Sequence, residues 1–144
     1  MAFDQYNKLT PFEYRILQEV HGERELTVWG SAVGAALSYL SGTGLITSTF
    51  DGVLTDKGKE ALAYGPEERT DFEAGPTISF TYTNHRGETR QRTIHPFGIE
   101  YLKTPGYGYE PGWFVRGFDP EKKAVRSFAL INIHTNDQSL FLRW

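Results

Sequence analysis

The sequence predicts an α+β protein in which a helical N-terminal half precedes a small antiparallel β-barrel. Apolar residues recur at helical spacing in the stretch 10–63, whereas from residue 77 onward they alternate with polar residues in short runs. A polar stretch with a Gly-Pro pair at each end, residues 65–76, separates the two patterns. We therefore expect two domains, residues 1–64 and 77–144, joined by a linker at 65–76.

The first helix is predicted from its start signals. Thr10 suits the N-cap, Pro11 suits the first helical position, and Glu13 completes a capping box. The apolar residues that follow recur at helical spacing and predict a buried stripe: Phe12, Ile16, Leu17 and Val20. We expect this helix to end near His21 and Gly22.

A second helix is predicted from Val28 or Ser31 to Ser41, ahead of the helix-stopping glycines Gly42 and Gly44. Residues 45–50 and 53–55 are expected to form a hairpin through the turn at 51–52. Thr55 is expected to cap a third helix over residues 56–63.

This order of elements resembles a winged helix-turn-helix. The resemblance rests on residues 9–17, on residues 36–40 with 44–46, and on residues 54–58. It implies that the helix 30–41 enters a DNA groove, but this helix carries no Lys, Arg, Asn or Gln. DNA contact would then fall to the hydroxyl groups of Ser31, Ser38 and Tyr39. The same uncharged helix would equally suit a protein partner.

The C-terminal half is predicted to contain short sequential strands with tight turns. We expect them at residues 77–83, 89–95, 98–103, 112–118 and 126–133, with a further strand at 139–144. A small closed barrel would leave no exposed strand edges. The longer connection between residues 103 and 112 carries Tyr107 and Tyr109 on a Gly-Pro scaffold, and tyrosines in such loops favour partner contacts.

Four motifs in this half resemble those of the WYL-domain proteins. They are an aromatic strand ending at Tyr82, an Arg-x-x-x-Pro from Arg92 to Pro96, Trp113-Phe-Val in place of Trp-Tyr-Leu, and an Arg-x-Phe beginning at Arg126. The resemblance covers roughly the last half of the chain. It implies a barrel similar to the Sm and SH3 types, with a positively charged surface for nucleotides or nucleic acid. Residues 129–133 depart from the pattern, because Ala-Leu-Ile-Asn-Ile replaces the usual Arg-Leu-Asp-Arg-Ile.

The predicted ligand site combines aromatic and basic residues of these strands. Its members are Tyr82, Arg92, Trp113, Arg116 and Arg126. Charge favours this half for a polyanion, since residues 76–144 carry nine Lys and Arg against six Asp and Glu although the whole chain has a net charge of −3.

Several function classes find no support in the sequence. The chain has no cysteine, and its four histidines lack metal-ligand spacing. It has no glycine-rich phosphate loop and no nucleophile elbow. We therefore expect no enzyme activity, no metal and no cofactor. Without a long apolar run or a signal peptide, the expectation is a cytoplasmic protein that does not enter a membrane.

These observations predict a transcriptional regulator or nucleic-acid-binding protein whose barrel senses a nucleotide or nucleic acid, with a homodimer as a further expectation. The alternative is a non-catalytic adaptor that binds a protein through the helix 30–41 and the Tyr107/Tyr109 loop. A third interpretation is a nucleic-acid binder that acts through the barrel alone.

Overall fold

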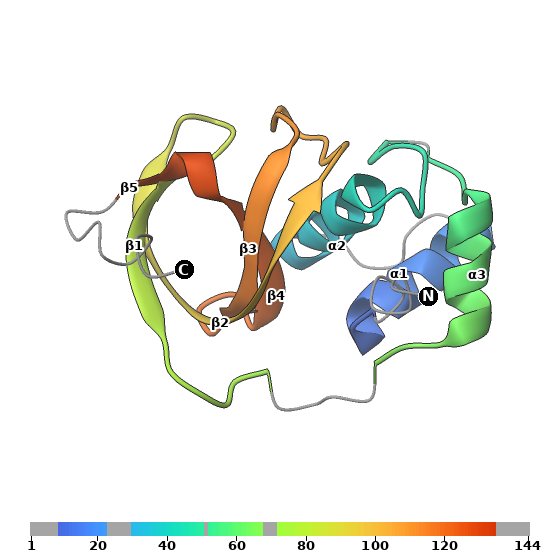
Figure 1. Ribbon diagram of the computed structural model, residues 1–144, viewed down its shortest axis with the longest axis horizontal. Coiled ribbons are helices and arrows are strands. Elements are labelled where there is room, and N and C mark those ends of the chain that lie inside the picture. The colour runs from blue at the N-terminus through green and yellow to red at the C-terminus, as the bar shows by residue number, and fades with distance from the viewer. Residues whose placement is uncertain (1–8, 23–29, 51, 68–71, 135–144) are drawn as a thin grey trace.

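The computed structural model describes residues 9–22, 30–50, 52–67 and 72–134, and it confirms an α+β architecture (Figure 1). The helices are α1 (Pro11–His21), α2 (Ser31–Gly42) and α3 (Asp56–Tyr64). The strands are β1 (Ile78–Thr83), β2 (Thr89–Leu102), β3 (Gly112–Asp119), β4 (Ala124–Ala129) and β5 (Ile133–His134), with a 3-10 turn η2 at Leu130–Asn132.

All three predicted helices are present, and α1 and α3 begin at the predicted caps. Thr10 accepts a hydrogen bond from the Glu13 backbone at 3.1 Å, and Glu13 accepts one from the Thr10 backbone at 3.0 Å. Thr55 caps α3 by accepting a hydrogen bond from the Gly58 backbone at 3.1 Å. Short polar caps therefore determine where α1 and α3 begin.

The predicted strands at 45–50 and 53–55 are reduced to one bridge, between Ile46 and Leu54. The Thr47 side chain accepts a hydrogen bond from the Val53 backbone at 3.1 Å, in addition to the backbone bond from Thr47 to Val53. Side chains that bond to nearby backbone groups compete with a regular ladder, so the hairpin stays short. Residue 51 of the predicted turn lies outside the described residues.

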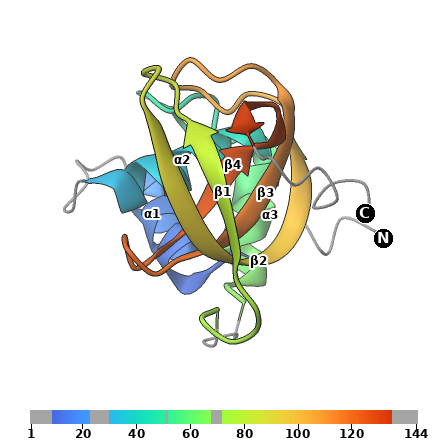
Figure 2. The ribbon, with the colours of Figure 1, turned by 90° about the vertical axis from the view of Figure 1, so that its left-hand side faces the viewer.

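The strands form one antiparallel sheet in the order β4-β3-β2-β1-β5. The predicted strands 89–95 and 98–103 are joined into the single long strand β2, because a register shift between Pro96 and Gly98 lets the strand bend without ending. The first half of β2 pairs with β1, and the second half pairs with β3. Figure 2 shows the resulting curvature, with β1 in front.

The sheet is open among the described residues, so the predicted closed barrel is not confirmed. The predicted strand 126–133 is divided into β4, η2 and β5. The backbone N–H of Ala129, the last residue of β4, donates to the Tyr82 hydroxyl at 3.0 Å. The chain then turns through η2 and pairs with β1 at the opposite edge. The predicted strand at 139–144 lies outside the described residues.

Helix α2 lies between α1 and the sheet (Figure 1). The main hydrophobic cluster joins side chains of all three helices to Leu102, Phe114 and Ala129 of the sheet. Side chains on the other sheet face form a second cluster: Phe80, Tyr82, Ile94, Val115 and Phe128. Because side chains alternate along a strand, neighbours such as Phe114 and Val115 serve different clusters.

The start of the loop after β2 fixes the end of α2 to the sheet. The Ser41 hydroxyl donates to the Thr104 carbonyl at 2.6 Å, and the Thr104 hydroxyl donates to the Ser41 carbonyl at 2.7 Å. The Lys103 backbone also donates to the Gly42 carbonyl at 2.9 Å. Helices and sheet are thus joined by polar contacts as well as by the shared core.

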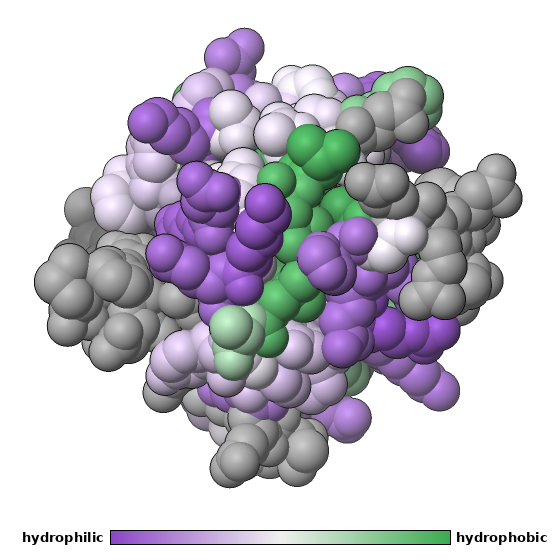
Figure 3. Space-filling view, turned by 90° about the vertical axis from the view of Figure 1, so that its right-hand side faces the viewer, coloured by the Kyte–Doolittle hydropathy of each residue, from purple (hydrophilic) through white to green (hydrophobic). Residues whose placement is uncertain are grey.

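The side of the molecule that carries α1 and α3 shows a band of apolar surface between polar side chains (Figure 3). No helix within the described ranges has the length and apolar character needed to cross a membrane.

We predict that Leu102→Ala lowers the free energy of unfolding by about 3 kcal/mol, because the Leu102 side chain is fully buried where the helices meet the sheet. Chemical denaturation followed by circular dichroism should show one earlier transition in which helix and strand signals are lost together. Ile131→Ala, at a side chain that is 87% exposed, should leave the midpoint unchanged. A helix signal that outlasts the strand signal would contradict a shared core.

Candidate functional site

Arg92 is buried without hydrogen-bond partners for two of its nitrogens. It lies on β2 directly opposite Phe80 of β1, and the residue is only 7% exposed. Within the described part of the chain, Nε and Nη1 of Arg92 are covered and have no hydrogen-bond partner. Burial, followed by the charges of Arg126 and Arg90, lowers the pKa of its guanidinium. A buried cation in this condition is costly, so its presence requires an explanation.

Among the described residues, four charged side chains act on the charge of Arg92, and we name the group the arginine cluster. It consists of Arg90, Arg92 and Arg126 with the carboxylates of Asp119 and Glu121. Nη2 of Arg90 lies 2.8 Å from Oε1 of Glu121, and Nη1 of Arg126 lies 3.4 Å from Oδ2 of Asp119. Glu121 is therefore paired with Arg90 and Asp119 with Arg126. The positive charge of Arg92 is the one that no carboxylate of the cluster pairs with.

The register of the strands builds this cluster from sequence positions that are far apart. Arg90 and Arg92 are two positions apart on β2 and therefore lie on the same face of the sheet. Arg126 of β4 pairs with Gly117 of β3. Asp119 ends β3 and is only 3% exposed at its side chain. Its Oδ1 accepts hydrogen bonds from the backbones of Glu121 and Lys122 at 2.9 and 3.3 Å. Asp119 thus anchors the turn that carries Glu121.

The Arg92 guanidinium, with two unpartnered nitrogens among the described residues, provides the chemistry of an anion site. Guanidinium N–H groups bind phosphate and carboxylate oxygens with strong, directional hydrogen bonds. Three guanidinium groups against two carboxylates leave the cluster with one net positive charge. One additional anionic group would both pair Arg92 and neutralise the cluster.

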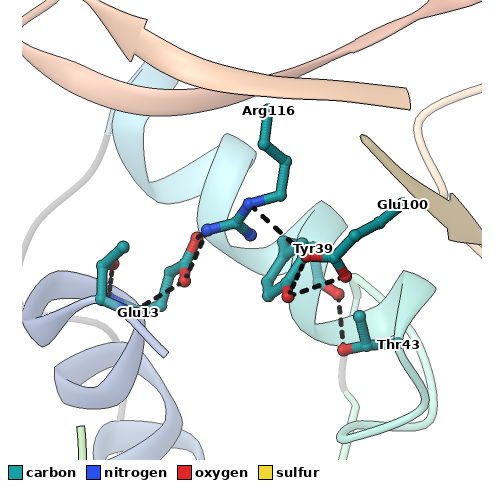
Figure 4. Close-up of polar contacts among 6 residues, drawn as sticks. Glu13, Tyr39, Thr43, Glu100 and Arg116 are labelled. Carbon is teal, nitrogen blue, oxygen red and sulfur yellow. Dashed lines mark hydrogen bonds and ion pairs between the residues drawn. The ribbon is translucent and has the colours of Figure 1, made fainter. Parts of the chain in front are cut away.

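Arg116, which the sequence placed in the same site, is not brought together with Arg92 and Arg126. It alternates with Val115 and Gly117, so its side chain leaves the other face of β3 and reaches the helices (Figure 4). Its Nη2 lies 3.1 Å from Oε2 of Glu13, and its side chain is 3% exposed. The structure therefore assigns Arg116 to the contact between the sheet and α1.

Two further groups complete the surroundings of Arg116. Its guanidinium carbon lies 3.5 Å from the centre of the Tyr39 ring, and its Nε lies 3.9 Å from Oε1 of Glu100. Burial lowers the pKa of Arg116, but Glu13, Tyr39 and Glu100 outweigh burial and raise it. Arg116 is thus held as a cation between two carboxylates and an aromatic ring.

Tyr39 is also internal, which removes it from the predicted DNA or partner surface. Its hydroxyl donates to the Glu100 carboxylate at 2.9 Å, and only 3% of the residue is exposed. Burial is the largest cause that raises its pKa, so the hydroxyl stays protonated. Ser38 is half-buried on α2. The side chain of Ser31 lies outside the described part of the structure.

Tyr82 and Tyr109 also have structural roles. The Tyr82 hydroxyl donates to that of Tyr109 at 3.2 Å and accepts from the Ala129 backbone at 3.0 Å. Tyr82 is 3% exposed, and burial raises its pKa. Tyr107 differs, because it is 38% exposed and its ring centre lies 6.1 Å from that of His85. Of the two predicted loop tyrosines, Tyr107 is the one that a partner could reach.

Trp113, a member of the predicted ligand site, lies at the surface of the sheet. It is 56% exposed and makes an edge-to-face contact with Tyr101, whose ring centre lies 5.5 Å away. The two residues are direct partners on β3 and β2, and Tyr101 is itself 51% exposed. Trp113 lies four positions before Gly117, the partner of Arg126, so their backbones are about 13 Å apart along β3 and both positions belong to the same sheet face.

Sequence reasoning did not identify Arg90, Asp119, Glu121 or Tyr101. Alternation along 90–92 could have indicated Arg90 as a companion of Arg92. The other three depend on which strands pair and in which register, and the sequence pattern alone does not give this.

We predict that Glu13→Gln lowers the free energy of unfolding by about 3 kcal/mol, because it leaves the Arg116 cation buried without its nearest carboxylate. Glutamine can still accept the capping hydrogen bond, so the loss reports on charge. Adding Arg116→Met should recover part of that stability. Denaturant titration of both variants checks this, with Glu60→Gln on the exposed face of α3 as the control. A loss no greater than that of the control would contradict the account.

Comparison with known proteins agrees with this geometry for one part of the chain. Residues 73–136 match the family model of the WYL domain. The match contains β1 to β5, the arginine cluster and the Trp113–Tyr101 pair. No curated protein and no solved structure matches the chain significantly. Among the described residues, no group of three His, Asp or Glu side chains could hold a metal ion. The comparison therefore supports a WYL domain in the C-terminal part of this protein, at residues 73–136.

Proposed function

We propose that this protein binds a nucleotide or nucleic acid through the arginine cluster and acts as the sensing part of a transcriptional regulator. The observation that carries the proposal is the buried Arg92 guanidinium, which has two unpartnered nitrogens and no ion pair among the described residues. Arg116 also has two unpartnered nitrogens, but Glu13 and Glu100 balance its charge. A WYL domain at residues 73–136 is compatible with this role, since the domain occurs in transcriptional regulators and nucleic-acid sensors.

Phosphate is the ligand group that best fits the cluster. Its oxygens accept several guanidinium hydrogen bonds at once, and its charge balances the net positive charge around Arg92. Lysine- and arginine-led contacts to phosphate are also the usual source of affinity for nucleic acid.

The Trp113–Tyr101 pair supplies the second half of a nucleic-acid surface. Exposed aromatic rings beside basic groups stack on bases with little sequence preference. The separation of about 13 Å between Trp113 and the strand position paired with Arg126 is more than one stacked base step, so we expect an oligonucleotide to contact both features.

The proposal assigns the nucleic-acid contact to the sheet and not to α2. Buried α2 side chains such as Val33, Leu37 and Leu40 pack in the shared core. The route for a signal from sheet to helices would be β3, which carries Arg116 from the ligand-binding sheet to Glu13 at the start of α1. A winged-helix role for the helical half, with a DNA contact of its own, stays a prediction.

The adaptor alternative is favoured by the apolar band on the α1 and α3 side (Figure 3) and by the exposed Tyr107. It is not favoured by the predicted docking helix, because much of α2 is covered by α1 and the sheet. The two functions differ in their response to salt, since phosphate-led binding weakens steeply as salt rises.

We predict that Arg92→Ala weakens binding of a labelled oligothymidylate by about tenfold or more, and reduces the salt slope by about one. Fluorescence anisotropy at two salt concentrations measures both quantities. Arg86→Ala, in the exposed turn between β1 and β2, makes the same charge change and should have little effect. Equal affinities for Arg92→Ala and the unaltered protein would refute the proposed site.

A second prediction separates stacking from phosphate binding. Trp113→Ala should weaken oligothymidylate binding by about 1–3 kcal/mol, because one base loses its aromatic platform. Competition by inorganic phosphate should be unchanged, since the arginine cluster is intact. Tyr64→Ala removes an aromatic ring that is 53% exposed on α3 and serves as the control. An equal loss in both variants would remove Trp113 from the site.

A further inference from the structure

The Arg90–Glu121 ion pair is the most exposed contact of the arginine cluster. Glu121 belongs to the turn between β3 and β4, and its carboxylate lies 2.8 Å from Arg90. The two side chains are 56% and 50% exposed. The hydrogen bond and charge of Arg90 lower the pKa of the Glu121 carboxyl, and Arg92 contributes to the same shift. Glu121 is therefore an anion that the protein itself supplies to this cluster.

The neighbouring contact between Arg126 and Asp119 is built differently. The Asp119 side chain is 3% exposed and also accepts two backbone hydrogen bonds from its own turn. Exposed ion pairs hold little free energy, whereas a buried carboxylate with several donors is costly to displace. Of the two carboxylates, Glu121 is the one that a ligand can displace.

Some displacement is required before a ligand can reach Arg92. Its Nε and Nη1 are both covered, although they lack partners within the described residues. The turn that carries Glu121 contains Lys123 at φ +53°, a left-handed conformation that a lysine seldom adopts. The turn thus contains a strained residue, Lys123, and an exposed ion pair, Glu121–Arg90, and it is held at its start by the hydrogen bonds of the buried Asp119.

We propose that Glu121 is a built-in competitor for the ligand's phosphate group, which binds by taking Arg90 from Glu121 and pairing with Arg92. This inference rests on the proposed function of the arginine cluster. The exchange replaces one carboxylate by one phosphate, so the site takes a single phosphomonoester or phosphodiester group at a time. With Glu121 displaced, a dianionic phosphomonoester neutralises the cluster, whereas a phosphodiester leaves one net positive charge. Anions that bind guanidinium no better than a carboxylate are excluded, and the turn moves about Asp119 when the ligand enters.

The test compares Glu121→Gln with the unaltered protein, using a labelled oligothymidylate and inorganic phosphate as its competitor. Removing the internal anion should tighten oligothymidylate binding by about fivefold and lower the phosphate concentration needed for competition. Glu60→Gln on α3 makes the same change in net charge away from the cluster, and its affinity should match that of the unaltered protein.

The double variant Glu121→Gln/Arg92→Ala shows whether the gain depends on Arg92, and its binding should be lost. If the double variant still bound more tightly than the unaltered protein, or if Glu60→Gln tightened binding as much as Glu121→Gln, the gain in affinity would come from net charge alone. Either result would overturn the inference. If Glu121→Gln bound with unchanged affinity and binding still required Arg92, Glu121 would not be a competitor, but the proposed function would stand. Binding by neither the unaltered protein nor Glu121→Gln would overturn both, and binding only by Glu121→Gln would support both.

Discussion

The buried ion pair between Arg116 and Glu13 is the contact on which the arrangement of helices and sheet depends. Glu13 has two tasks, because its Oε1 accepts the capping hydrogen bond from Thr10 and a hydrogen bond from Arg116 at 3.2 Å. The start of α1 is therefore fixed to the middle of β3. α2 lies within this connection, and its Tyr39 ring covers the Arg116 guanidinium. Loss of either charge would leave the other buried without its partner, which is far more costly than loss of a surface pair.

Arg92 and Arg116 are two buried arginines of the same sheet with different surroundings. Arg116 faces the helices, where Glu13 and Glu100 balance its charge. Arg92 faces the other side, where Asp119 and Glu121 pair with neighbouring arginines instead. A protein tolerates a costly buried charge mainly where it is needed for function. The distribution of carboxylates thus distinguishes the arginine that joins the sheet to the helices from the one to which we propose that a ligand binds.

The sequence predicted those features that depend on local interactions. Thr10 and Glu13 marked the start of α1, and alternation marked the strands that carry Arg92 and Trp113. It did not predict that Arg116 would leave the site, since alternation shows that neighbours point apart but not what covers each face. The predicted strands of the hairpin at 45–55 were too long, because the Thr47 side chain bonds to the Val53 backbone and competes with a regular ladder. The single bent β2 depends on a register shift at Pro96, which only the pairing with β3 determines.

The central claim is that the Arg92 guanidinium receives the ligand, and the most direct measurement is NMR of arginine side-chain Nε–H groups during titration with oligothymidylate. Arg92→Lys assigns the Arg92 signal by its disappearance. The account predicts that the Arg92 Nε–H resonance shifts and becomes protected from solvent exchange on binding, because a new acceptor pairs with it, while the Arg116 resonance stays in place. Shifts confined to other arginines, with Arg92 unchanged, would contradict the account.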